Sequence, residues 1–170
     1  MVRYWIGLGS NIGDRLGHLR HAATLIEALG TVIRKSRVFA ASPVGGPPQP
    51  PFLNAALILD SELDPPLLLA ELQRIEGECG RTRADEPVRW GPRTLDLDIL
   101  LSGVRGETIL HTPGLEIPHP RLSSRAFALG PLVDLSPDLL HPVDSRTLAA
   151  LYQSLHGTTS DVTAPTGDAL

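Results

Sequence analysis

The sequence predicts an α+β fold in which one antiparallel sheet carries helices on its faces. Strand-like and helix-like segments follow one another in the order β-α-β-β-α-β, which is the ferredoxin-like arrangement. At 170 residues, 42% of them hydrophobic, the chain is the size of one ordinary domain with a sizeable core. We therefore expect a single α/β sandwich over 1–156 and a loosely ordered C-terminal tail over 157–170.

The expected strands are apolar or β-branched runs that end at glycine, proline or serine. They cover residues 3–9, 31–41, 52–59 and 94–101. Two amphipathic stretches predict helices, over about 14–29 and 64–79. Asn11 or Asp14 would cap the first helix, and Asp64 would cap the second.

Two long loops interrupt this pattern. Residues 43–51 hold five prolines and two glycines, which excludes a helix or a central strand. Residues 81–92 form a second loop that is rich in charge. Loops of this length inside a compact domain are often functional, although the first could be a simple spacer.

The last third of the chain predicts shorter elements. Two short strands, a Pro-His-Pro turn and two helices are expected, over 108–111, 115–117, 118–120, 124–129 and 146–155.

Composition excludes several classes of protein. The net charge of −4 argues against a general nucleic-acid binder, whose affinity depends on neutralising many phosphates. The single cysteine, Cys79, cannot form an internal disulfide and favours a reducing compartment, so we expect a cytoplasmic protein. No apolar stretch approaches the length of a membrane span or resembles a signal peptide.

The most informative motif is a pair of aspartates in the expected strand 94–101. Alternate side chains of a strand share a face, so Asp96 and Asp98 would point the same way, about 6.6 Å apart at roughly 3.3 Å per residue. Leu95, Leu97 and Ile99 would then point into the core. Paired carboxylates are suitable ligands for Mg²⁺ in a phosphoryl-transfer site, whereas the alternative is a solvated strand face.

Arginines gather just before these aspartates. The chain has 14 arginines and one lysine, and five arginines fall within twenty residues: Arg74, Arg81, Arg83, Arg89 and Arg93. The planar guanidinium binds phosphate oxygens in pairs, so this cluster suits a nucleotide phosphate chain. The alternative is a salt-bridged surface helix in which Glu76 and Glu78 neutralise Arg74 and Arg81.

Two common nucleotide-binding motifs are excluded. The glycines at 7, 9 and 13 resemble a dinucleotide fingerprint, but Ile12 stands in place of its third glycine. Lys35-Ser36 lacks the preceding glycine of a P-loop.

Taken together, seven segments carry a resemblance to a known family. They are Gly9-Ser10-Asn11, Ser42-Pro43, Phe52-Leu53-Asn54-Ala55-Ala56, Gln73-Arg74-Ile75-Glu76, Gly80-Arg81-Thr82-Arg83, the run 89–99 and Pro118-His119-Pro120-Arg121. In this order they resemble the 6-hydroxymethyl-7,8-dihydropterin pyrophosphokinases of folate biosynthesis, over about residues 3 to 143. The resemblance implies a transferase that moves pyrophosphate from ATP to the pterin hydroxymethyl group and releases AMP, with two Mg²⁺ ions.

The resemblance also implies residue roles. The catalytic residues would be Arg81, Arg93, Asp96 and Asp98, and the two aspartates would hold both Mg²⁺ ions. ATP would contact Gln73, Glu76, Arg83, Trp90, Ile99, His119 and Arg121. The pterin would contact Ser42, Pro43, Val44, Phe52, Asn54 and Phe127.

In this scheme Phe52 and Phe127 sandwich the flat pterin, Asn54 reads its polar edge, and loops 43–51 and 81–92 close over the substrates. The alternative for each phenylalanine is ordinary core packing. We expect a monomer that acts on these two small molecules, with no nucleic-acid or membrane partner.

Some positions depart from the family pattern, and two other functions remain open. Ser42 stands where threonine is common, Ala126 stands where glycine is common, and the tail beyond 143 matches poorly. A metal-dependent nucleotidyltransferase would also use paired aspartates and arginines, but it would transfer AMP. A non-catalytic ferredoxin-like nucleotide-binding module would bind without turnover.

Overall fold

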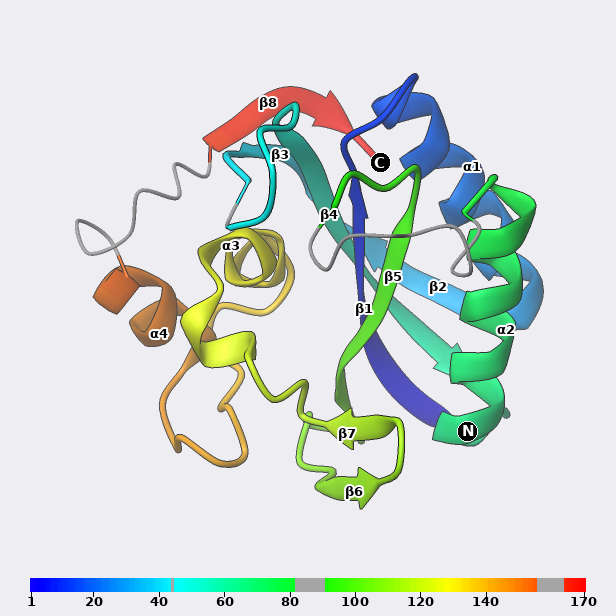
Figure 1. Ribbon diagram of the computed structural model, residues 1–170. Coiled ribbons are helices and arrows are strands. Elements are labelled where there is room, and N and C mark those ends of the chain that lie inside the picture. Colours follow the sequence, from blue (N-terminus) through cyan, green and yellow to red (C-terminus); the bar gives the residue numbers. More distant parts are fainter. Residues whose placement is uncertain (44, 82–90, 156–163) are drawn as a thin grey trace.

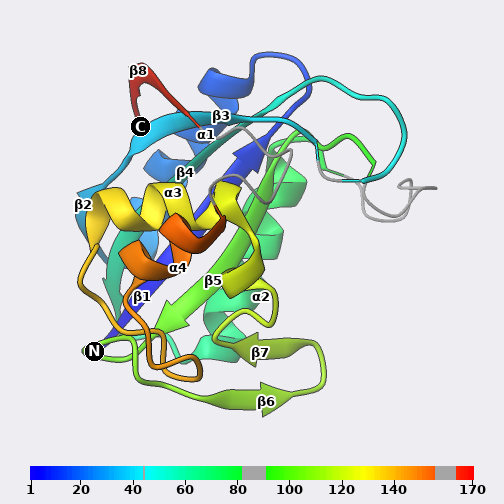
Figure 2. The same ribbon diagram turned by 90° about the vertical axis from the view of Figure 1, so that its left-hand side faces the viewer.

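The computed structural model describes residues 1–43, 45–81, 91–155 and 164–170, and it confirms the ferredoxin-like α+β class. A six-stranded antiparallel sheet lies between two layers of helices (Figures 1 and 2). Helices α1 and α2 cover one face, and α3 and α4 lie on the other. The site described below depends on how this second layer covers the sheet.

The elements of the two layers are as follows. The helices are α1 (Arg15–Ile26), α2 (Pro65–Glu78), α3 (Ala126–Leu135) and α4 (Leu148–Leu155), with 3₁₀ turns η1 (Glu27–Leu29) and η3 (Leu122–Ser124). The sheet contains β1 (Val2–Ser10), β2 (Thr31–Lys35), β3 (Arg37–Ala41), β4 (Phe52–Ser61), β5 (Asp96–Ser102) and β8 (Ala164–Ala169). A separate hairpin consists of β6 (Leu110–Thr112) and β7 (Leu115–Ile117).

The sheet order is β5-β1-β4-β3-β8, and β2 pairs with the second half of β4. Strand β1 lies between β4 and β5 and fixes their register. Gly9 pairs with Asn54 on one side and with Asp96 on the other. Because paired residues of antiparallel strands point to the same side, these three positions form one row across the sheet.

The helix caps follow the predictions. The Asp14 side chain accepts a hydrogen bond from the Gly17 N–H at 3.0 Å and caps α1. Asp64 caps α2 in the same way, with Pro65 at the first helical position. Among the described residues, no helix combines the length and the apolar composition that a bilayer span requires.

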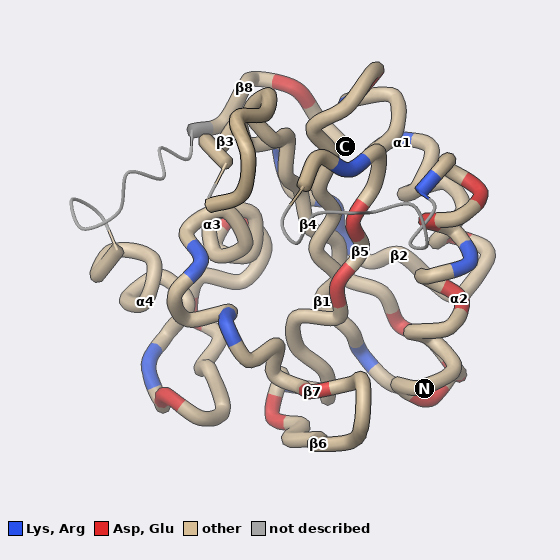
Figure 3. Tube along the Cα trace, viewed as in Figure 1, with Lys and Arg blue, Asp and Glu red and all other residues tan. Residues whose placement is uncertain are grey.

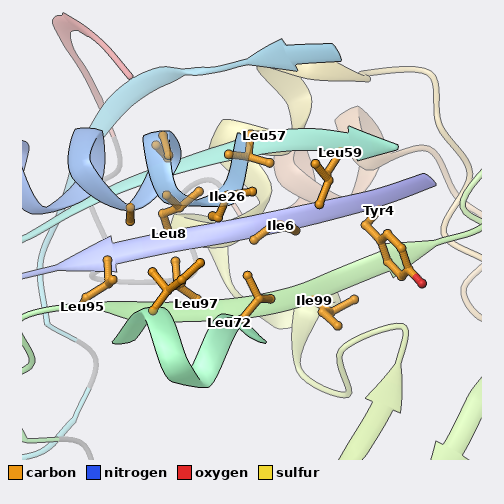
Figure 4. Close-up of a cluster of buried hydrophobic side chains, with 14 of the residues drawn as sticks. Tyr4, Ile6, Leu8, Ile26, Leu57, Leu59, Leu72, Leu95, Leu97 and Ile99 are labelled. Atoms are coloured by element: carbon orange, nitrogen blue, oxygen red, sulfur yellow. The ribbon is translucent and has the colours of Figure 1, made fainter. Parts of the chain in front are cut away.

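The core lies on both sides of the sheet. Between the sheet and α1 and α2, the side chains of Leu8, Leu57 and Leu97 pack with Ile26 and Leu72 (Figure 4). Leu95, Leu97 and Ile99 are no more than 3% exposed, which confirms that they point inward. The aspartates that alternate with them must therefore point to the opposite face.

The predicted strand over 31–41 is divided into β2 and β3. The buried residue Ser36 separates them: its N–H donates to the Ala56 carbonyl, and its hydroxyl accepts from the Ala56 N–H. This local pairing lets β2 and β3 join different halves of β4.

Helix α3 is longer than the predicted 124–129 and continues through Pro131. The missing N–H of a proline inside a helix normally disfavours this. Here the burial of Leu129, Leu132 and Leu135 offsets that cost.

The C-terminal segment also differs from the prediction. Residues 164–169 form β8, which pairs with β3, and are therefore not a loose tail. The Arg20 guanidinium on α1 donates two hydrogen bonds to the Ala169 carbonyl, at 3.1 and 3.0 Å. Residues 156–163 lie outside the described part of the chain.

Candidate active site

The α3 side of the sheet divides into an apolar half and a polar half. Trp5, Ile58 and Leu100 belong to the core cluster that α3 and α4 cover. Further along the same strands, this face carries Asp96 and Asp98 instead. Figure 3 marks acidic positions along β5 and basic positions in the chain that leads into α3.

Two glycines of β1 let neighbouring side chains approach the sheet closely on this face. A Cβ atom on Gly9 would lie 3.1 Å from Asn54 Oδ1 and 4.0 Å from Asp96 Cβ. A Cβ atom on Gly7, two residues earlier, would lie only 3.0 Å from Leu100 Cδ1. The glycines of the excluded dinucleotide motif therefore have a different role, since they let Asn54 and Leu100 pack directly against the β1 backbone.

Asp96 is held by the two arginines that were predicted to act with it. Its Oδ1 lies 2.6 Å from Arg81 Nη1, and its Oδ2 lies 3.0 Å from Arg93 Nη1. Glu76 binds Arg81 from behind at 2.7 Å and also accepts the Leu97 N–H at 2.8 Å. Because the Glu76 and Arg81 side chains are only 1% and 6% exposed, this ion pair belongs to the interior of the site.

The alternative, in which Glu78 and Glu76 neutralise Arg74 and Arg81, is realised in both pairs, but only the Arg74 pair lies on an exposed helix surface. Arg74 pairs with Glu71 and Glu78 along the exposed side of α2. Arg74 is therefore separate from the Arg81 cluster.

The two aspartates have opposite pKa shifts. Burial, together with the negative charge of Asp96, raises the pKa of Asp98 to about 7. Burial acts in the same direction on Asp96, but the charges of Arg93 and Arg81 outweigh it and lower the Asp96 pKa below its ordinary value. A cation placed between the carboxylates would relieve the repulsion that Asp98 experiences.

The donor set suits magnesium. The described residues contain no group of three or more His, Cys, Asp or Glu side chains that could hold a metal. Mg²⁺ needs only one or two carboxylates when water and substrate phosphates supply the remaining oxygen ligands. Asp96 and Asp98 therefore fit Mg²⁺ bound together with a phosphate chain.

His119 stands at the edge of the site with a defined proton position. Its backbone N–H donates to the Leu100 carbonyl, which ties it to β5. Its Nδ1 accepts the Arg121 backbone N–H at 3.2 Å, so the neutral ring carries its proton on Nε2. Burial, together with the charges of Arg125 and Arg121, lowers the His119 pKa to about 4. Near pH 7 His119 is a neutral hydrogen-bond donor.

The region predicted to bind the pterin lies on β4 and at the start of α3. Asn54 is 6% exposed, and its Nδ2 is a buried donor with no hydrogen-bond partner among the described residues. Phe52, half-buried, is two residues away on the same strand face. Phe127 lies in the first turn of α3, and the Arg125 guanidinium is 5.3 Å from its ring centroid.

Comparison with known proteins decides the family. The model of the 7,8-dihydro-6-hydroxymethylpterin-pyrophosphokinase family matches residues 5–137. The chain belongs to this family.

Two relatives of this pyrophosphokinase family show how far the similarity extends. The chain is 43% identical over 151 residues to 2-amino-4-hydroxy-6-hydroxymethyldihydropteridine pyrophosphokinase of Pseudomonas aeruginosa, across 88% of this chain and 89% of the relative. It is 46% identical over 133 residues to the Bacillus subtilis protein of the same name, across 77% and 76%.

Solved structures support the fold. Wild-type Plasmodium falciparum HPPK-DHPS with pterin and p-hydroxybenzoate superimposes with a TM-score of 0.68 at 16% identity. The chain is covered to 90%, but it spans only 43% of that longer protein. An HPPK-DHPS in complex with substrates gives a TM-score of 0.69 at 13% identity, with the same coverage of both chains.

Not every residue assigned from the pyrophosphokinase pattern lies in this cluster. The Ile99 side chain is in the core, on the face of β5 opposite the aspartates, so an ATP contact would have to use its backbone on this edge strand. Gln73 is exposed on α2, and Ser42 is exposed just after β3. Pro43, next to Ser42, is half-buried. Val44, Arg83 and Trp90 lie outside the described residues.

Arg125 was not assigned from the sequence. It is the N-cap residue of α3. Burial and the charge of Arg121 lower the pKa of Arg125, and the charges of Asp98 and Asp96 oppose that shift. No helical spacing identified it, because Arg125 is the N-cap residue and its extended backbone, not a helical turn, sets its guanidinium over the Phe127 ring.

Proposed function

We propose that the protein transfers pyrophosphate from ATP to 6-hydroxymethyl-7,8-dihydropterin and releases AMP, as a step of folate synthesis. Family membership supports this reaction class. The observation that carries the proposal is one row across the sheet: Asp96 with its two arginines, the bare backbone of Gly9, and the buried donor of Asn54. This row offers a phosphate site and a flat polar site side by side.

In this proposal the pterin lies beside Asn54, on the face of the sheet that carries Gly9. Asn54 Nδ2, which has no partner within the described part of the chain, donates to an acceptor on the pterin edge. This bond would satisfy a donor that is otherwise costly to bury. Phe52 and Phe127 cover the faces of the ring, with Ser42, Pro43 and Val44 beside it. Unlike a core phenylalanine, each of these two side chains is only half-buried.

The phosphates of ATP lie at Arg81 and Arg93, with Gln73, Arg83, Trp90, His119 and Arg121 assigned to the nucleotide. Asp96 and Asp98 would hold Mg²⁺, which when bound neutralises phosphate charge and orients the attacking hydroxyl. Glu76 keeps Arg81 in place, and we assign it no direct contact with ATP.

The reaction is an in-line displacement at the β-phosphorus. The pterin hydroxyl oxygen forms a bond to that phosphorus, the bond to the α,β-bridging oxygen breaks, and the hydroxyl proton is released. Arg81 and Arg93 stabilise the charge that develops on the phosphoryl oxygens, and no covalent enzyme intermediate is needed. His119 donates its Nε2–H to a phosphate oxygen and does not act as a base.

Chromatography of the nucleotides tests this proposal. The protein is mixed with ATP, MgCl₂ and the pterin, and parallel reactions lack the pterin or the metal. AMP formed in proportion to the pterin consumed, and only when both are present, is the expected result. Pyrophosphate release would instead indicate a nucleotidyltransferase, and the absence of turnover would indicate a binding module.

We further propose that the enzyme works as a monomer in the cytoplasm. Residues of one chain bring the phosphate-side and pterin-side groups together in one row, which supports this proposal. Light scattering should give the mass of one chain, 18.2 kDa. A dimer at working concentration would contradict this.

A further inference from the structure

Asn11 joins two segments of the site that are far apart in sequence. Its side chain is 1% exposed. Asn11 Nδ2 donates to Gln49 Oε1 at 2.8 Å and to the Pro50 carbonyl at 3.0 Å. Asn11 Oδ1 accepts the Arg93 N–H at 2.8 Å, and the Asn11 N–H donates to the Arg93 carbonyl at 3.1 Å. The nitrogen and the oxygen of one buried side-chain amide thus each bind the backbone or side chain of a different loop.

Each of these segments leads directly to one half of the site. Arg93 binds Asp96 through its guanidinium, so its backbone sets where the phosphate-side charges lie. Pro50 precedes Phe52 by two residues, and Asn54 follows two residues later on the same strand face. Asn11 therefore lies between the phosphate side and the pterin side and fixes the backbone of both.

A second hydrogen bond from the start of α1 to the same loop is weaker than those of Asn11. Arg15 Nη1 donates to the Pro51 carbonyl at 2.8 Å, but this bond is exposed to solvent. A buried hydrogen bond between fixed partners constrains geometry more than an exposed bond from a long side chain. The two-sided restraint therefore rests on Asn11.

We propose that Asn11 is a positioning residue that sets the spacing between the pterin-binding segment and the phosphate-binding arginine. This inference rests on the proposed function. Asn11 acts through Gln49, Pro50 and Arg93. Removing its amide should therefore change how well the two substrates are aligned, in addition to any change in stability.

Kinetics of four proteins test the proposal: the wild type, Asn11→Ala, Gln49→Ala and Ser61→Ala. Ser61 is the matched control, because it is 1% exposed and makes two hydrogen bonds at the far end of β4. Thermal unfolding is measured for each. The kinetic constants are the KM for each substrate and the kcat, taken well below the unfolding temperature.

Asn11→Ala should lower kcat at least tenfold and raise the pterin KM about tenfold, as expected for the loss of one or two well-aligned hydrogen bonds. Gln49→Ala should raise the pterin KM about threefold while kcat and the ATP KM stay within about twofold. Ser61→Ala should lose comparable stability with unchanged kinetics.

Unchanged kinetics in folded Asn11→Ala would overturn the inference. An equal loss of kcat in Ser61→Ala would also overturn it, because the effect would then be one of stability. If Asn11→Ala does not fold, the Gln49→Ala result decides alone, and an unchanged pterin KM rejects the proposal. A wild type that forms no AMP would instead reject the proposed function.

Discussion

Asp96 and Asp98 lie on the same face of one strand, yet their surroundings shift the pKa values of the two carboxyl groups in opposite directions. Two arginines bind Asp96 and keep it ionised, whereas Asp98 is buried beside that negative charge and its pKa rises to about 7. In the metal-free protein Asp98 is thus the carboxyl group of the pair that is harder to ionise. Groups that are costly to ionise in the resting state are typical of sites that receive a cation.

Asp98→Asn should therefore separate stability from activity. Because the folded pKa lies above the ordinary value of 3.8, the folded state binds this proton more tightly than the unfolded chain. The metal-free wild type then loses stability as the pH rises from about 4 through 7, and the variant lacks this loss. At pH 8 we expect the Asp98→Asn variant to be more stable than the wild type, by roughly 1 kcal/mol or more, while turnover is abolished.

Denaturant unfolding with a chelator at pH 5 and pH 8, together with the AMP assay, would measure both effects. Retained turnover would contradict the metal assignment. A variant that is less stable than the wild type at pH 8 would contradict the raised pKa.

Gly9 provides the second residue-level prediction. The missing Cβ matters because its position would be 3.1 Å from Asn54 Oδ1, in the space assigned to the pterin. Gly9→Ala should raise the pterin Kd by about tenfold or more, with a much smaller effect on nucleotide affinity. Titration of each ligand separately, compared with Gly77→Ala, whose added Cβ would meet no described atom within 4 Å, provides the measurement and its control. Equal pterin affinity in both variants would place the ring elsewhere.

At the scale of elements, β1 does most to build the site, although it contributes few functional side chains. It holds β4 and β5 in register, so Asn54 and Asp96 lie on either side of Gly9. The chain then turns at Asn11 into α1. A strand in this position explains why glycines near the N-terminus belong to a site whose charged residues come much later in the sequence.

Local patterns predicted the elements whose signals lie in adjacent residues. Asp64-Pro65 marked the start of α2, and the alternation around Asp96 gave the correct face of β5. The break at Ser36 and the extension of α3 through Pro131 were missed, because both depend on partners elsewhere in the chain. The same distinction holds for the site. Asp96 was found by its spacing from Asp98, and Arg81 by its place in the arginine cluster and by the family resemblance, whereas Gly9 and Asn11 acquire their roles only through long-range pairing.

Strand β8 is the element for which local sequence was least informative. Pro165 and Gly167 disfavour a strand, yet main-chain pairing with β3 and the Arg20 bonds to Ala169 hold it in place. Removal of residues 164–170 should expose the edge of β3 and lower the unfolding temperature by several degrees, about 2–4 °C per kcal/mol lost. Calorimetry of the truncated and full-length chains would measure this. An unchanged unfolding temperature would show that β8 adds no net stability.

At the scale of the whole molecule, ion pairs join segments that are distant in sequence. Arg3 binds Asp60 through two bonds of 2.7 Å between β1 and β4. The hydrogen bonds and charge of Arg3 lower the Asp60 pKa below 3.8. Because the folded pKa is depressed, this pair stabilises the fold at neutral pH and stops doing so as the pH falls through the folded pKa.

Asp60→Asn should accordingly unfold a few degrees below the wild type at pH 7, and the difference should shrink as the pH is lowered below 3.8, through the depressed pKa of Asp60. Thermal unfolding over this pH range is the measurement. Asp138→Asn, at an exposed position after α3, serves as the control. A difference that does not depend on pH would mean that packing, and not charge, is responsible.

The ion pairs around Asp96 have a consequence for how the substrates arrive. In the absence of nucleotide, both oxygens of Asp96 are bound to arginine, so the site supplies its own counter-ions. Magnesium alone must compete with two guanidinium groups, and free ATP must draw those groups away from a carboxylate. The magnesium–nucleotide complex meets neither obstacle, because it offers an anion to the arginines and a cation to the aspartates in one exchange of partners. We therefore expect the resting enzyme to select the pre-formed complex over either of its components.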